Sequence, residues 1–202
     1  ERVELLVDNE HTKKTASLLI FSHPFANEKN IRFHLIGTMD SWIRDYGPTF
    51  VVNKEKKELG MVAWIFNGWG MKYEHEEPLS NDKRIPAEIN KLLKIKEFRP
   101  GIVLEGGSIE VNGAGTVITS EQCLLNKNRN PRLNKYQIEN YLREYLNVEK
   151  IVWVGEGIEG DDTDGHIDDI ARFVGETGHG RAGVMEGVDV PAPVGRVRDQ
   201  AE

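Results

Sequence analysis

The chain has 202 residues, of which 39% are hydrophobic and 29% charged, an ordinary balance for a globular protein with one large domain or two small ones. Its formal net charge of −7 at pH 7 disfavours nucleic acid as a partner and weakly favours a small cationic molecule. The single cysteine, Cys123, excludes an internal disulfide, and no signal peptide or long apolar run is visible, so we expect a cytoplasmic protein that does not bind membranes.

The N-terminal half is predicted to alternate strands and helices. Short apolar runs between polar residues indicate strands, and apolar residues that recur every three to four positions indicate helices. The expected strands are residues 3–7 (buried), 31–36, 49–53 and 58–66, the last two forming a hairpin, and the expected helices are residues 10–21 and 85–93, with Ala16, Leu19, Ile20, Ile85, Ile89, Leu92 and Leu93 facing inward.

The C-terminal half continues this pattern as far as residue 174. We expect a hairpin of residues 109–111 and 116–119, a helix over residues 134–146 with Asn134 as its N-cap, and strands at 150–154 and 170–174. Beyond this point glycine and proline are frequent and no apolar period remains. We therefore assign residues 1–174 to one domain, and residues 175–202 to a tail that is loosely ordered or foreign to it.

Three polar loops recur in this succession of elements. They are residues 40–48 (DSWIRDYGP), 104–108 (LEGGS) and 160–169 (GDDTDGHIDD). Glu105 lies 60 residues after Asp45, and His166 lies 61 residues after Glu105. A repeat of this length predicts similar modules whose loops meet at one end of a common axis, which would bring Asp45, Glu105, His166 and Asp168 together.

The third loop, with five carboxylates and one imidazole, admits three interpretations. It is a solvated acidic turn, a metal-binding loop, or a pocket for a cation. As an EF-hand it fails, because aligning Gly165 with the invariant glycine leaves Gly160 and Ala171 where acidic ligands are required. Transition metals usually require two or three His or Cys ligands, and only His166 is suitably placed, so we expect no metal.

A guanidinium or amidine site fits these loops better. Carboxylates such as Asp45 and Asp168 can accept paired hydrogen bonds from a planar cation, and Trp42 can stack on that cation. On an extended backbone His166 and Asp168 would share one side, where the imidazole could act as general acid and base. The other tryptophans, Trp64, Trp69 and Trp153, are predicted to belong to the core, and Arg44 is expected to pair with a nearby acid.

Five motifs together resemble the agmatine deiminases, a family of the guanidine-modifying superfamily that is similar to the bacterial peptidylarginine deiminases. They are residues 40–48, 66–73 (FNGWGMKY), 104–109 (LEGGSI), 122–131 (QCLLNKNRNP) and 161–168 (DDTDGHID). The resemblance implies an α/β fold of repeated ββαβ modules, a partial five-bladed α/β-propeller with about three of five modules present. It also implies a cofactor-free hydrolase of putrescine biosynthesis that converts agmatine and water to N-carbamoylputrescine and ammonia.

By motif, the resemblance implies a role for each site residue. Asp45 and Asp168 would hold the guanidinium nitrogens, and His166 would be the general acid and base. Trp42 and Asp162 would contact the substrate, while Glu105 and its two glycines would mainly shape their loop.

The family's nucleophile is a cysteine in a glycine-rich motif near the C-terminus, which has no counterpart here. Cys123, beside Leu124 and Leu125, is expected to be a small buried side chain rather than that nucleophile. We therefore expect the chain as given to be inactive. The alternatives are a deiminase of free or peptidyl arginine and a non-catalytic guanidine-binding module, and a homo-oligomer is possible.

Overall fold

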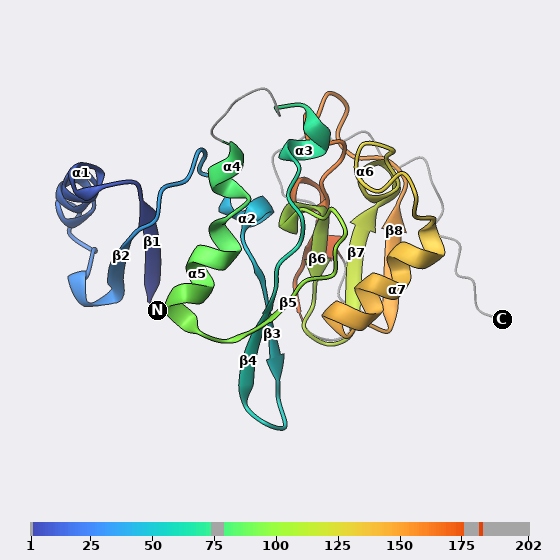
Figure 1. Cartoon of the computed structure of the whole chain (residues 1–202), viewed down its shortest axis with the longest axis horizontal. Helices are drawn as coiled ribbons and strands as arrows, with labels where there is room; N and C mark the ends of the chain where they lie inside the picture. The colour runs from blue at the N-terminus through green and yellow to red at the C-terminus, as the bar shows by residue number, and fades with distance from the viewer. Residues whose placement is uncertain (1, 74–78, 176–181, 184–202) are drawn as a thin grey trace.

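The computed structural model describes residues 2–73, 79–175 and 182–183 (Figure 1). The described part is a mixed α/β fold with four small sheets. Its strands are β1 (Val3–Val7), β2 (Ile31–Leu35), β3 (Thr49–Asn53), β4 (Glu58–Val62), β5 (Lys96–Phe98), β6 (Ile109–Val111), β7 (Thr116–Ser120), β8 (Lys150–Val154), β9 (Arg172–Phe173) and β10 (Ala182–Gly183). Its helices are α1 (Glu10–Phe21), α2 (Ile43–Tyr46), α3 (Gly68–Met71), α4 (Leu79–Asp82), α5 (Ile85–Leu93), α6 (Glu121–Leu124) and α7 (Lys135–Leu146), with short 3-10 turns η1 (Glu28–Asn30), η2 (Gly106–Ser108) and η3 (Ile167–Asp169).

Two complete copies of a β–β–α–β unit occupy the middle of the chain. In the first, β3 and β4 are antiparallel and β5 lies parallel to β4, after α5. The second repeats this arrangement with β6, β7 and β8, and α7 precedes the parallel strand. The recurring order expected from the sequence is therefore present.

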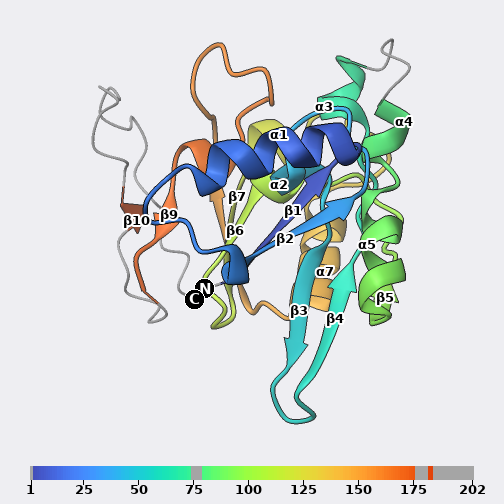
Figure 2. The same ribbon diagram turned by 90° about the vertical axis from the view of Figure 1, so that its left-hand side faces the viewer.

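Partial units flank the two complete ones. The strands β1 and β2 are parallel and connected through α1, which packs against both strands (Figure 2). They correspond to the last two strands of a complete unit. At the other end, β9 pairs antiparallel with β10, as the first two strands of a unit do. The predicted tail of residues 175–202 lies outside the described residues, apart from Gly175 and β10.

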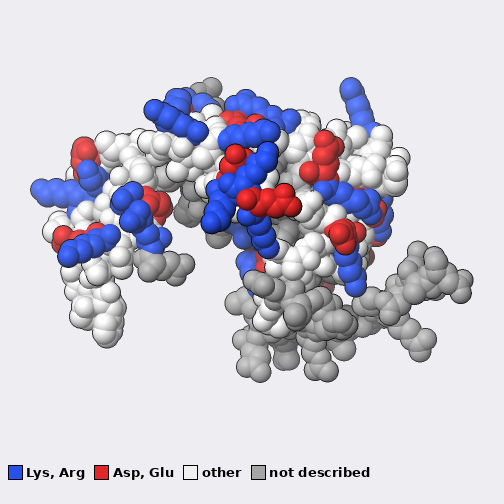
Figure 3. Space-filling model, turned by 90° about the horizontal axis from the view of Figure 1, so that it is seen from below, with Lys and Arg blue, Asp and Glu red and all other residues white. Residues whose placement is uncertain are grey.

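The main apolar core lies between the two complete units. It combines residues of β4, β7, α6 and α7 with the segment that precedes η2: Val62, Trp64, Ile102, Leu104, Ile109, Val117, Cys123, Leu124, Ile138, Leu142 and Val148. The β3–β4 hairpin extends away from this core (Figure 1). Basic and acidic side chains gather in the middle of the face seen from below (Figure 3), and residues 54–58 at the hairpin tip are three lysines and two glutamates. No helix in the described ranges is long and apolar enough to cross a membrane.

Tertiary packing changes several burial predictions. The strand β1 was expected to be buried, but only Val7 at its end is buried. Leu19 in α1 is 70% exposed, and Leu92 and Leu93 in α5 are also exposed, because neither helix is covered on all of its apolar positions. The predicted strand at residues 170–174 shortens to β9, since the chain turns through η3 immediately before it.

Candidate active site

Three short helical turns meet at one end of the molecule, each following the last strand of a unit. They are α2 after β2, η2 after β5 and η3 after β8. Residues 40–48, expected to be a plain loop, thus contain the helical turn α2. Its Arg44 fixes η2 by donating from Nε to the carbonyl of Gly106 at 3.1 Å. Arg44 also pairs with an acid, as expected, but the partner is Glu110, 66 residues away in the chain and not named from the sequence.

Gly107 lies at the point where the three turns touch. Its amide donates to Asp45 Oδ1 at 3.0 Å. A Cβ at this position would lie 2.5 Å from His166 Nδ1 and 3.0 Å from Asp168 Oδ1, closer than a side chain tolerates. The absence of a side chain at Gly107 therefore allows Asp45, His166 and Asp168 to come together, as the repeat predicted.

Asp45 is buried, and each of its oxygens has a partner. Besides the Gly107 amide, Trp69 Nε1 donates to Asp45 Oδ2 at 2.9 Å, and His166 Nδ1 lies 3.5 Å from Oδ1. Trp69 was predicted as a core residue. It does pack in a cluster with Tyr46, Phe66 and Ile85, but its indole also orients the site carboxylate. The glycines on both sides of Trp69 belong to a segment with positive φ angles, but nothing in this local pattern indicates the bond to Asp45.

His166 is 2% exposed and begins η3 as its N-cap. Its Nδ1 lies 3.8 Å from Asp168 Oδ1. The two residues share this side because of the 3-10 turn η3, so the extended backbone predicted from the sequence is wrong. Burial lowers the pKa of His166, and the nearby Asp45 carboxylate opposes this effect without cancelling it.

Asp168 has an unusual proton affinity for a carboxyl group. Burial, followed by repulsion from Asp169 and Asp45, raises the pKa of Asp168 to about 6, although Arg44 and Arg172 oppose the shift. A carboxylate under such repulsion is stabilised by an incoming cation. The electrostatics of the site thus favour a positively charged ligand beside Asp168.

Two of the carboxylates in the acidic loop, Asp161 and Asp164, accept hydrogen bonds or ion pairs that hold the loop together. Asp161 accepts hydrogen bonds from Thr163 and from the amides of Gly165 (2.8 Å) and His166 (3.1 Å). Burial would raise the pKa of Asp161, but these hydrogen bonds outweigh it and lower the pKa. Asp164 pairs with Lys72 at 2.7 Å and with Arg129 at 2.6 Å.

A cavity of about 470 Å³ opens above this cluster. Its wall includes six aspartates and one arginine, besides His166, so its charge is strongly negative. Trp42 is 58% exposed at the cavity, and Asp162 receives a hydrogen bond from Tyr73 at 3.3 Å. The lining is Met39, Asp40, Trp42, Arg44, Asp45, Trp69, Tyr73, Asp161, Asp162, Thr163, His166, Asp168 and Asp169.

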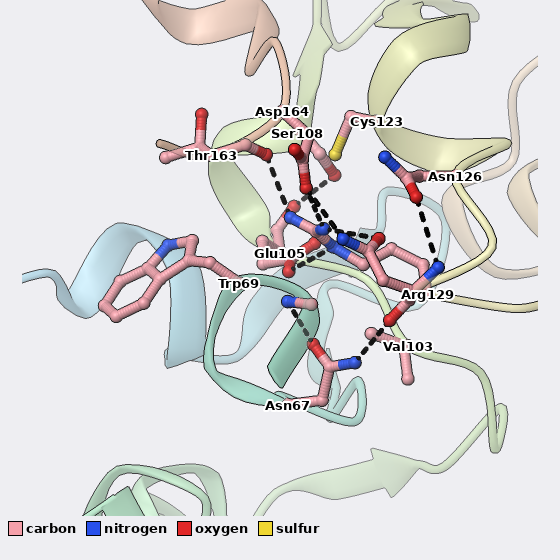
Figure 4. Close-up of polar contacts among 12 residues, drawn as sticks. Asn67, Trp69, Val103, Glu105, Ser108, Cys123, Asn126, Arg129, Thr163 and Asp164 are labelled. Carbon is pink, nitrogen blue, oxygen red and sulfur yellow. Dashed lines mark hydrogen bonds and ion pairs between the residues drawn. The ribbon is translucent and has the colours of Figure 1, made fainter. Parts of the chain in front are cut away.

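Glu105 does not line the cavity but lies buried beneath it. Arg129, also fully buried, donates from Nε to Glu105 Oε1 at 2.8 Å and from its terminal nitrogens to Asp164 and to the carbonyl of Thr163 (Figure 4). Arg129 thereby connects the second polar loop with the third. No role was predicted for Arg129 from the sequence, although it belongs to the motif of residues 122–131.

Cys123 is buried in the apolar core and is absent from the cavity lining. Burial, followed by repulsion from Glu105, raises the pKa of its thiol. A thiol that stays protonated is a poor nucleophile. The geometry therefore agrees with the prediction that Cys123 is a packed side chain.

Comparisons with known proteins converge on one family. The model of the Porphyromonas-type peptidyl-arginine deiminases matches residues 1–178. A putative agmatine deiminase from Legionella pneumophila (strain Paris) is 44% identical over 174 residues, which are 86% of this chain and 47% of the relative. An agmatine deiminase from Pseudomonas fluorescens is 46% identical over 147 residues, covering 72% of this chain and 40% of the relative.

Solved structures show the same relationship. An agmatine deiminase from C. jejuni with substrate bound is 35% identical with a TM-score of 0.74, covering 87% of this chain and 49% of that one. A putative arginine deiminase from Porphyromonas gingivalis is 29% identical with a TM-score of 0.73, covering 87% and 50%. The chain spans about half the length of the relatives it matches.

Proposed function

Because the chain belongs to the family of Porphyromonas-type peptidyl-arginine deiminases, we propose that it forms the guanidinium-binding part of an agmatine deiminase. This enzyme converts agmatine and water to N-carbamoylputrescine and ammonia. The observation that carries the proposal is the placement of Asp45, His166 and Asp168 around Gly107, at the base of a cavity lined by aspartates. The agmatine deiminases among the relatives support the substrate.

In this proposal Asp45 and Asp168 accept hydrogen bonds from the guanidinium nitrogens. Trp42 covers the aliphatic chain, and Asp162 on the cavity wall attracts the distal ammonium group. A neutral His166 takes the proton of a cysteine thiol, and the resulting thiolate attacks the guanidinium carbon. The imidazolium then protonates the departing ammonia, and the neutral ring activates the water that hydrolyses the amidino-thioether.

Cys123 cannot be this thiol, because it lies in the core beneath the cavity. It is the sole cysteine among the 202 residues. We therefore expect the 202-residue chain to bind agmatine without releasing ammonia. Ammonia release from agmatine by the purified chain would contradict this assignment, and the loss of that release in Cys123→Ser would identify Cys123 as the nucleophile.

Agmatine is favoured over arginine by the charge of the cavity. Six aspartates on its wall suit a ligand that is cationic at both ends, whereas the α-carboxylate of arginine would be repelled. Titration calorimetry with agmatine and arginine tests this directly. Binding of agmatine alone supports the proposal, whereas arginine binding equally well would favour a deiminase of free or peptidyl arginine.

Gly107→Ala supplies the structural control. Its Cβ would displace His166 and Asp168, so agmatine affinity should fall at least about tenfold, the equivalent of ~1.4 kcal/mol. Gly155→Ala is the matched variant, because a Cβ at that glycine meets nothing within 4 Å. It should bind agmatine as the wild type does.

The larger architecture is also part of the proposal. We propose that the repeated units belong to a five-bladed α/β-propeller, of which residues 1–174 form about three modules. The two complete units with equal strand order support this, as does the end of the family match at residue 178. The separate character of residues 175–202, the cytoplasmic location and a homo-oligomer stay predictions.

A further inference from the structure

Glu110, the middle residue of β6, binds two arginines through one carboxylate oxygen. Its Oε2 accepts hydrogen bonds from Arg44 Nη2 at 3.1 Å and from Arg172 Nη1 at 2.7 Å. The same two guanidinium groups lie near Asp168, where Arg44 Nε and Arg172 Nη2 are 3.9 Å and 3.8 Å from Oδ2. Two carboxylates, Glu110 and Asp168, thus share two cations.

Glu110 holds both cations more closely than Asp168 does. Hydrogen bonds between a guanidinium group and a carboxylate measure about 2.7–2.9 Å, so the distance from Arg172 to Asp168 is about 1 Å too long for one. In the described part of the chain nothing donates a hydrogen bond to the Asp168 carboxylate, although its side chain is only 17% exposed and lines the cavity. The acceptor positions of Asp168 are therefore open to a ligand.

Arg172 is the cation that could occupy these positions. Arg44 is fixed independently of Glu110, because it also donates to two backbone carbonyls of η2 and β6 at 3.1 Å. The side chain of Arg172 is 42% exposed, and Glu110 is the one hydrogen-bond acceptor of its guanidinium group within residues 2–73, 79–175 and 182–183. Arg172 and a guanidine substrate present the same charge and the same planar fork of donors, so they would compete for Asp168.

We propose that Glu110 is a positioning residue, which holds the guanidinium group of Arg172 away from Asp168 and keeps this carboxylate available to the substrate. The identity of that substrate rests on the proposed function. Without the charge of Glu110, Asp168 would be the carboxylate nearest to Arg172, and a movement of about 1 Å would join the two. A substrate would then have to displace a cation that belongs to the chain itself.

The charges around Asp168 give this competition a measurable direction. A cation that moves into contact lowers the pKa of an aspartate by about 1–3. In Glu110→Gln the pKa of Asp168 should therefore fall from its value of about 6 by at least about 1. If Glu110 instead pressed the arginines onto Asp168, the same variant would raise this pKa. The charged and titratable groups that face Asp168 are Asp45, His166, Asp169, Arg44 and Arg172.

Carbon-13 NMR of the carboxyl carbons follows this titration without any ligand. The Asp168 resonance is assigned by its absence from Asp168→Asn, and the same spectra show whether each variant is folded. We expect the pKa of Asp168 to fall in Glu110→Gln and to return to the wild-type value or above in Glu110→Gln/Arg172→Met. An unchanged or higher pKa in Glu110→Gln overturns the proposal, as does a low pKa that persists in the double variant.

Titration calorimetry measures the consequence for binding. Agmatine affinity at pH 7 should fall at least about tenfold in Glu110→Gln, because the ligand must displace a charge-assisted pair, and should recover when Arg172→Met is added. A loss that the second substitution does not reverse would mean that Glu110 acts only on the fold, which contradicts the proposal.

Glu139→Gln is the matched control, because it removes the carboxylate of another glutamate–arginine pair, 3.0 Å from Arg143 on α7 and absent from the cavity lining. This variant should bind agmatine as the wild type does, and an equal loss of affinity in it would contradict a specific role for Glu110. A wild-type chain that binds no agmatine would contradict the proposed function, whereas the NMR titration would still decide the role of Glu110.

Discussion

At the scale of single residues, Asp45 shows how a buried charge is kept in place. It is surrounded by donors that come from other loops, the Gly107 amide and the Trp69 indole. A buried carboxylate needs such partners, since an unpaired one loses its hydration without compensation. The orientation of Asp45 thus depends on residues far from it in the sequence.

Replacing Trp69 by Phe tests this dependence. The variant keeps a ring against Phe66 but removes the donor to Asp45, and a lost hydrogen bond to a charged group costs about 1.5–3 kcal/mol. Urea unfolding measures the change. Trp64→Phe is the control, because it removes only a neutral hydrogen bond to Thr49, worth about 0.5–1.5 kcal/mol. Equal losses of unfolding free energy in Trp69→Phe and Trp64→Phe would show that the charge of Asp45 adds nothing to the strength of the hydrogen bond from Trp69.

The raised pKa of Asp168 makes stability depend on pH. The folded-state pKa is about 6 and the unfolded one about 3.8, so the folded protein binds this proton more tightly. The contribution to stability is complete below the lower value and is lost as pH rises through about 6. The side chain in Asp168→Asn stays neutral at every pH. The free energy of unfolding of this variant should therefore rise relative to that of the wild type between pH 4 and 7, by at most about 3 kcal/mol.

Urea unfolding of Asp168→Asn and wild type at several pH values follows this difference. A difference that stays constant over the range would contradict the assigned pKa. Agmatine affinity is a second measurement on the same variant. It should be lost at every pH, because the neutral amide no longer offers a charge to the guanidinium group.

The sequence predicted that Asp45, His166 and Asp168 lie together because each stands in a loop with its own polar signature, and the three side chains do meet around Gly107. Trp69 and Arg129 escaped notice for a physical reason. Their decisive partners lie 24 residues or more away in the chain, Asp45 for Trp69 and Glu105, Thr163 and Asp164 for Arg129. Periodicity and local motifs contain no information on such contacts.

At the scale of secondary structure, α7 begins with a reciprocal cap. The Asn134 side chain accepts from the backbone amide of Gln137, and the Gln137 side chain accepts from the backbone amide of Asn134. Both amides lack partners inside the helix, so the cap stabilises its first turn. The helix then buries Ile138 and Leu142 in the main core.

Asn134→Ala should therefore lower global stability by about 1 kcal/mol, with a range of about 0.5–2 kcal/mol. Asn9→Ala offers a comparison, since Asn9 caps α1 in the same way at 2.9 Å, but α1 has no buried residue. Fraying of α1 should leave the rest of the fold intact. The loss of unfolding free energy measured by chemical denaturation should therefore be smaller in Asn9→Ala than in Asn134→Ala. A larger loss from Asn9→Ala would contradict this difference between the helices.

The same contrast explains which elements the sequence predicted well. The strands β3, β7 and β8 and the helix α7 follow from local alternation, turns and caps, which act within a few residues. The turns α2, η2 and η3 are shorter than any apolar period. They are set by contacts with one another, such as the one between Gly106 and Arg44.

At the scale of the whole molecule, Arg129 connects separate units. It joins Glu105 at η2 to the acidic loop before η3, with no exposed side-chain surface. Arg129→Met would leave Glu105 buried without a counter-charge, which costs about 3–5 kcal/mol. Arg143→Met is the control, because its exposed pair with Glu139 contributes about 0.3–0.5 kcal/mol. Unfolding in guanidinium chloride measures both losses of stability. Equal losses in Arg129→Met and Arg143→Met would contradict a connecting role for Arg129.

The sparse packing of β1, α1 and β2 has a consequence for local opening. Because Val7 is their sole buried residue, backbone amides there should exchange with deuterated solvent faster than those of β7 or α7. This segment leads into the cavity wall, and Asp8 Oδ1 accepts the amide of Thr38 at 3.2 Å. A ligand that immobilises Trp42 and Asp45 should therefore slow deuterium uptake in β2, a strand that contributes nothing to the cavity wall.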